Sequence, residues 1–170
     1  MATTYEAIAT VTVGSGGAAS IEFTSIPQTY TDLLVKYSLR DNVTSGGASN
    51  NATISFNGSS ANGTSRELYG NGATAASASL TNAKVDYHSS ANATANTFGS
   101  AELYIPNYTS SNNKSSSSDG VSETNATTAL MAMNANLWSQ TAAITSLSLA
   151  PSGGSWVQYS SATLYGIKNS

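Results

Sequence analysis

Few side chains in this sequence could carry catalysis. The chain has one histidine, His88, no cysteine and nine acidic residues among its 170 residues. A serine hydrolase triad would need His88 as its general base, and no G-x-S-x-G segment is present to supply the nucleophile. We therefore predict that His88 lies on the polar face of a strand or at a strand end and has no catalytic role.

The acidic residues are spread singly along the chain, beside predicted turns or on the polar side of predicted strands. A glycosidase needs two carboxyl groups on either side of a cleft, and the spacing favours no such pair. Asp41 and Asp119 stand in DN and DG dipeptides, which are typical of turns. A calcium site built from a loop and its backbone carbonyls stays open. We predict a protein that is not an enzyme, with no catalytic residue, cofactor or metal.

Charge is scarce as well. Charged residues make up 9 % of the chain, the net charge is −3, and the six lysines and arginines are scattered. A nucleic-acid interface needs clustered basic residues, and no stretch is apolar over the length that a bilayer requires. The first residues lack the basic and apolar parts of a signal peptide. We expect neither nucleic acid nor a membrane as a partner.

Aromatic residues are the remaining candidates for binding. Tyr104, Tyr108 and Trp138 stand near predicted loops or on the wetter side of predicted strands. Such rings can stack on a sugar or contact a protein surface, so these three are our candidate surface-contact residues. The alternative is that they pack in the core and across strands.

The elements that would position these residues are strands. Segments with a hydrophobic period of two follow one another, separated by Gly, Asn, Ser and Pro. Strands are predicted at 5–13, 19–26, 31–40, 52–58, 79–90, 97–108, 142–151 and 156–168. Residues 127–138 fit a strand or a short helix, region 59–78 has a weak pattern, and 109–120 (TSSNNKSSSSDG) is predicted to be a loop.

About eight or nine short strands without an amphipathic helix predict an all-β chain. We expect one domain over 1–170, an antiparallel β-sandwich of jelly-roll type, with a barrel as the alternative. The end of the chain, SATLYGI, is apolar on both parities, as in a strand covered on both faces. It is predicted to be an interior strand that pairs with an earlier one such as 4–13.

Several phrases of the chain occur in a characteristic order. They are the opening TTYEAIATVTVGSGGAASIEFTSIPQTYTDLLVKYSLRDN and then ISFNG, LYIPNYTSSNNK, AAITSLSL and SATLYGI. This ordered set resembles a group of small structural proteins of tailed bacteriophages, frequent among marine and freshwater phages. The resemblance covers nearly the whole chain, and region 59–78 matches least well.

The resemblance implies a non-enzymatic virion component, assembled in the bacterial host cytoplasm, with a β-sandwich fold. Its expected partners are the major capsid protein or other virion proteins, and a homo-oligomer, trimer or dimer, is expected. A capsid decoration or cement protein is the first hypothesis. The alternative is a receptor-binding or fibre-tip domain that binds a host glycan with loops 41–51 and 107–120.

Overall fold

The computed structural model describes residues 4–125 and 129–168, and these form twelve strands and no helix. The strands are β1 (Tyr5–Thr12), β2 (Ile21–Phe23), β3 (Asp32–Leu39), β4 (Ser49–Phe56), β5 (Gly63–Gly70), β6 (Ala75–Leu80), β7 (Lys84–Ser89), β8 (Gly99–Ile105), β9 (Lys114–Ser122), β10 (Leu130–Trp138), β11 (Leu147–Pro151) and β12 (Ser161–Ile167).

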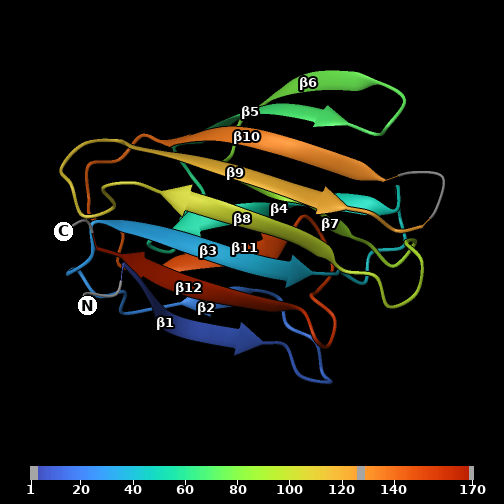
Figure 1. Cartoon of the computed structure of the whole chain (residues 1–170), viewed down its shortest axis with the longest axis horizontal. Coiled ribbons are helices and arrows are strands. Elements are labelled where there is room, and N and C mark those ends of the chain that lie inside the picture. The colour runs from blue at the N-terminus through green and yellow to red at the C-terminus, as the bar shows by residue number, and fades with distance from the viewer. Residues whose placement is uncertain (1–3, 126–128, 169–170) are drawn as a thin grey trace.

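The strands pack as a sandwich of two antiparallel sheets (Figure 1). The larger sheet has the order β1-β12-β3-β8-β9-β10-β5-β6, and the smaller has the order β2-β11-β4-β7. The quartet β1-β12-β3-β8 lies opposite the quartet β2-β11-β4-β7. Along the chain these eight strands change sheet at every step except from β4 to β7, which is the winding of an eight-stranded jelly roll. The predicted all-β jelly-roll sandwich is therefore confirmed.

Two hairpins extend the jelly roll beyond the predicted eight or nine strands. Hairpin β5–β6 is inserted between β4 and β7, and hairpin β9–β10 between β8 and β11. Both add to the same side of the larger sheet. The region 59–78 is thus mostly strand, and residues 114–120 of the predicted loop belong to β9, which corrects that prediction. Residues 130–138 are strand, which resolves the choice between strand and helix.

The last strand, β12, lies inside the larger sheet. β12 pairs with β1 on one side and with β3 on the other over its full length, as predicted. Ala162 and Leu164 face the core. The ring of Tyr30 packs directly on Gly166: a Cβ atom at position 166 would lie only 2.4 Å from Tyr30 Cγ, so any larger residue would clash. On the opposite parity, Thr163 and Tyr165 are half-buried and Ile167 is buried, and cover of this face by another chain stays a prediction.

The apolar core lies between the two quartets of the jelly roll. Its largest fully buried side chains come from both sheets and from the segment before β12: Trp156, Leu33, Leu103, Leu149 and Leu164. Several strands are shorter than predicted: β2 ends at Phe23, β7 begins at Lys84, β8 ends at Ile105, β11 begins at Leu147 and β12 begins at Ser161. Ile144 is still fully buried, although it lies outside the strand in which it was predicted.

Candidate functional site

The structure does not bring the three predicted aromatic contact residues together. Tyr104 lies on the solvent side of β8 and is 37 % exposed, as a surface residue should be. Tyr108 is fully buried, and its hydroxyl donates to the carbonyl of Pro27. Trp138 is buried with its ring centroid 5.4 Å from that of Phe56. Tyr108 and Trp138 are therefore core residues, and only Tyr104 remains available for surface contact.

The two loops proposed for a glycan site also lie apart. β3 and β8 are antiparallel neighbours, with Leu33 opposite Ile105 and Leu39 opposite Gly99. The loop after β3 therefore leaves one end of the sandwich and the loop after β8 leaves the other, as Figure 1 shows. These loops cannot form one site within a single molecule.

His88 is buried, contrary to the prediction of a polar-face position, and it pairs with a buried aspartate. Its Nε2 lies 2.8 Å from Asp41 Oδ2, and both side chains are at most 1 % exposed. Asp41 also accepts hydrogen bonds from Asn50 Nδ2 at 2.8 Å and from the backbone N–H of Val43 at 2.9 Å. Asp41 was predicted to be ordinary turn chemistry, and its sequence context shows no sign of these three donors.

The position of the pair explains its role. The backbone of Asp41 donates to Ser89 at the end of β7, so the chain leaving β3 crosses here to the smaller sheet. The ring of His88 meets that of Trp156 edge-on at 4.7 Å. Burial opposes the charge on Asp41, but the bonds from His88, Asn50 and Val43 outweigh it and lower its pKa. Because Asp41 follows β3 of the larger sheet and His88 belongs to β7 of the smaller one, the pair links the two sheets at one end of the sandwich.

More buried polar groups lie between the smaller sheet and the two hairpins, β5–β6 and β9–β10, that extend the larger sheet. β7 packs against β9 and β10. There Ser122 Oγ lies 2.9 Å from Ser49 Oγ, and Asn51 Nδ2 donates to Glu67 Oε1 at 3.0 Å. Burial raises the pKa of Glu67, and the hydrogen bond from Asn51 and the charge of Lys84 offset this only in part. Hydrogen bonds, more than aliphatic packing, therefore attach this part of the sheet to the layer behind it.

Lys114, at the start of β9, is a buried lysine held by backbone carbonyls. Its Nζ lies 2.6 to 3.2 Å from four carbonyl oxygens of the two neighbouring loops, those of Ser110, Asn112, Thr141 and Ala142. The ammonium group also lies 5.8 Å from the ring centroid of Trp138. Burial lowers the pKa of Lys114. One ammonium group thus joins the loop before β9 to the loop after β10.

We predict that Lys114→Met lowers the free energy of unfolding by about 1 to 3 kcal/mol, the usual worth of hydrogen bonds to a charged group. Methionine retains much of the apolar stem but leaves the loop carbonyls without their donor. Urea unfolding measures the loss. Lys36→Met is the control, because Lys36 is exposed and makes one surface ion pair, with Glu102 at 3.1 Å. Equal stability of the two variants would contradict the role of Lys114.

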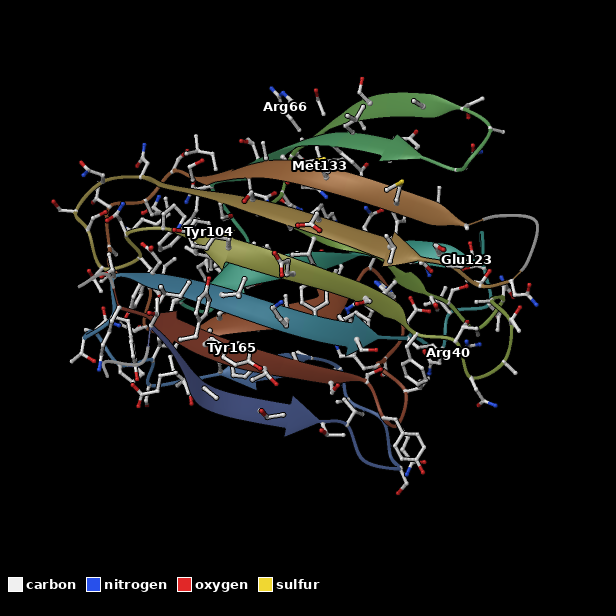
Figure 2. The ribbon with its side chains drawn as sticks, in the orientation of Figure 1. Arg40, Arg66, Tyr104, Glu123, Met133 and Tyr165 are labelled. Atoms are coloured by element: carbon white, nitrogen blue, oxygen red, sulfur yellow. The ribbon has the colours of Figure 1, made fainter. Side chains whose placement is uncertain are left out.

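The larger sheet turns one face to the smaller sheet and the other to solvent, and we call the second its outer face (Figure 2). Cross-strand registers define rows of side chains across this face. One row runs from Tyr165 through Leu34 to Tyr104. The next contains Lys36, Glu102, Asp119, Met133 and Leu68 in that order.

The two halves of the outer face differ in character. On the β12–β3–β8 half, a hollow of about 510 Å³ is lined by Tyr5, Leu34, Lys36, Glu102 and Tyr165. Tyr104 lies beside Leu34, and its hydroxyl donates to Asp32 Oδ2 at 2.8 Å. The hydrogen bond to Asp32, together with burial, raises the pKa of Tyr104. This half presents aromatic rings and charges.

The β9–β10–β5 half also carries Asp119 and Arg66, but its large exposed side chains are mostly apolar, and we call these the apolar patch. Its members are the exposed large side chains Leu68, Val121, Met131, Met133 and Leu137. Met131 and Met133 are 62 % and 64 % exposed, while Asn134 and Asn136 of the same strand are buried. Beside them, a hollow of about 280 Å³ is lined by Leu68, Tyr69, Gly70, Ala75, Met131, Ala132 and Met133.

Together, the fold and this surface define an all-β jelly-roll sandwich with one uncovered, partly apolar sheet face. Comparison of the chain with models of known protein families, with curated proteins and with solved structures gives no match. None of the described residues form a helix long and apolar enough to cross a lipid bilayer. Within the described ranges, no group of three or more His, Asp or Glu side chains could hold a metal ion.

Proposed function

We propose that this protein is a non-enzymatic structural component of a bacteriophage particle, a decoration or cement protein that binds the assembled head through the outer face. The observation that carries the proposal is the inverted pattern of β10. An antiparallel sheet with one wet face normally turns apolar side chains inward and polar ones outward. The middle of β10 does the reverse, since Met131, Met133 and Leu137 are exposed and Asn134 and Asn136 are buried between the inward-facing Ala132 and Trp138.

An inverted strand is favourable when another surface covers its exposed side. Contiguous exposed apolar side chains are typical of protein–protein contact sites, and methionine is enriched in such interfaces. Adjacent strands lie about 4.8 Å apart and rise about 3.3 Å per residue, so the eight strands of the larger sheet give it an outer face of roughly 1,000 Å². This area is sufficient for the about 800 Å² that each partner contributes to a standard interface.

The identity of the partner rests on the resemblance to phage structural proteins. A partner that binds the assembled head and not its dissociated subunits stabilises the head by mass action. The polar and aromatic half of the outer face would then set the orientation, and the apolar patch would supply most of the buried apolar area. The copies would be present in the virion in numbers that match the capsid lattice.

Binding of the chain to heads that lack it tests the proposal. We expect Met131→Lys combined with Met133→Lys to reduce binding at least tenfold, because two charges would be buried at the contact. Tyr159→Lys is the control, since Tyr159 is 69 % exposed but lies in the loop before β12, off the patch. Thermal unfolding should show that all variants fold. Undiminished binding of the double variant, or a few copies located only at the tail, would overturn the proposal.

A glycan-binding role is the second candidate, and the hollow between Tyr5 and Tyr165 favours it. Exposed tyrosine rings beside Lys36 and Glu102 offer both stacking surfaces and hydrogen-bonding groups for a sugar. On this hypothesis Tyr165→Ala lowers binding to host polysaccharide, while the double methionine variant does not. A screen of host cell-wall glycans with the purified chain separates the two functions.

A further inference from the structure

The sandwich has four sheet edges, and they differ in how they are protected. β1 and β6 are the edges of the larger sheet, and β2 and β7 those of the smaller one. An edge strand presents unpaired backbone N–H and C=O groups that can pair with another chain. Folded proteins usually block such edges with charges, prolines, bulges or very short strands.

Three of the edges carry one of these protections. The register of β1 with β12 is broken between Ala7 and Ala9, and the strand contains Glu6. β2 has only three residues, and one of them is Glu22. β7 has a register shift opposite Asn51 and Ala52, and it begins with a lysine. None of these three strands offers a long, regular and uncharged row of backbone groups.

β6 has none of these protections. Its sequence, AASASL, contains no charged residue and no proline. Its pairing with β5 is regular from Ser65 opposite Leu80 to Gly70 opposite Ala75. Four of its six residues are exposed and the other two are half-buried. Figure 1 shows β6 as the outermost strand of the larger sheet, with no segment beyond it.

We propose that β6 pairs antiparallel with β6 of a second copy of this chain, which joins two eight-stranded sheets into one of sixteen strands. The strand itself favours an identical partner. Alanine and serine alternate along most of it, so two copies can meet in antiparallel register without steric conflict or like charges. Such a contact has two-fold symmetry and uses the same surface on both copies, so the assembly closes at a dimer.

The neighbouring strands support this choice of partner. The nearest described charges on the outer face belong to β5, where Arg66 lies opposite Ser79. With Ser77 opposite Ser77 of the second copy, the two Arg66 positions are three strand spacings apart across the sheet and four residues apart along it, which is about 20 Å. Their repulsion is weak at that distance because it exceeds the Debye length of about 8 Å at physiological salt. A strand of a different protein, in contrast, could not be selected by charge, because β6 has no charged residue.

The dimer has a consequence for the outer face. The two-fold axis brings both apolar patches to one continuous sheet surface, one on either side of the seam. Two linked contacts bind a repetitive surface more tightly than one, because the second binding event becomes intramolecular. The dimer itself does not depend on the proposed head-binding function, so either proposal can fail without the other.

Charge-swapped variants at the centre of β6 test the proposal in the full-length chain. Ser77 is exposed on the outer face, opposite Leu68 in β5, so its replacement should leave the fold intact. Like charges directly opposite one another destabilise a strand pair, and opposite charges stabilise it. We expect Ser77→Lys alone and Ser77→Glu alone to be monomeric, and an equimolar mixture of the two to form dimers.

Sedimentation velocity over a concentration series gives the readout. The wild-type chain should show a concentration-dependent dimer, and each single variant should shift its dissociation constant at least tenfold upward. Thr12→Lys, an exposed position on the β1 edge, is the matched control and should dimerise as the wild type does. A wild-type chain that stays monomeric at every concentration, or single variants that dimerise normally, would overturn the proposal. A mixture that stays monomeric would exclude pairing through β6.

Discussion

Removal of Leu164–Ser170 is expected to abolish folding of the whole domain. The truncation deletes most of β12, which lies between β1 and β3 in the larger sheet. β1 and β3 each lose the register partners from Leu164 to Ile167, and only Ser161–Thr163 remain between them. The core also loses Leu164, which is fully buried. Far-ultraviolet circular dichroism and limited proteolysis of the purified chain would show an unfolded or insoluble product.

A shorter truncation provides the control for this prediction. Removal of Lys168–Ser170 leaves β12 complete and deletes the ion pair between Lys168 and Glu6, whose Nζ–O distance is 3.5 Å. Both side chains are half exposed, so their pairing contributes little. This chain should fold with nearly wild-type stability. If the longer truncation also remained folded, β12 could not be an integral strand of the sandwich.

The jelly-roll quartets could be predicted because their strands follow the simple rule of apolar residues inward and polar residues outward. β3 alternates from Val35 to Leu39 and β8 from Leu103 to Ile105, and β12 shows its interior position through its apolar residues. Hydrophobic periodicity is therefore sufficient to find a strand that packs against an aliphatic core.

The same rule fails for the extension because its inner face is polar. In β9 the inward positions of the central segment are serines, so the buried and exposed sides look alike in the sequence. β9 is nonetheless a strand, because β8 and β10 pair with it on both sides. In β5 the inward residues are Gly63, Ser65 and Glu67, which explains the weak pattern of region 59–78.

The buried ionisable groups could not be predicted for a related reason. Asp41 and His88 are 47 residues apart, and only the crossing between sheets brings them into contact. Tyr108 looks like a loop residue because it follows Pro106 and Asn107, yet its ring is fully buried. Contacts between residues far apart in the sequence do not produce a periodic pattern of side chains. The apolar patch, in contrast, does produce such a pattern in β10. Met131, Met133 and Leu137 share one parity of their strand.

Asp41→Asn is expected to lower the free energy of unfolding at neutral pH by about 3 kcal/mol, the typical cost of breaking a buried pair. Asparagine has nearly the same shape, but its Nδ2 carries protons where Asp41 Oδ2 accepts hydrogen bonds from His88 and Asn50. The pKa of Asp41 is lowered in the folded state, so its stabilising contribution is complete above the ordinary value of 3.8. It is lost as the pH falls through the lower folded-state pKa.

Glu67→Gln is the matched comparison, because Glu67 is a second buried carboxylate whose pKa shift has the opposite sign. A carboxyl group with a raised folded-state pKa loses stability as the pH rises from its unfolded pKa to its folded one. Glutamine removes this penalty and keeps an oxygen that accepts from Asn51. We expect equal or greater stability than the wild type at pH 7, where Asp41→Asn is strongly destabilised.

Urea unfolding of the three chains at pH 7 and in acid, near the lowered pKa of Asp41, measures both effects. The difference in the free energy of unfolding between the wild type and Asp41→Asn should become smaller in acid. A difference that does not change with pH would show that Asp41 does not act through its charge.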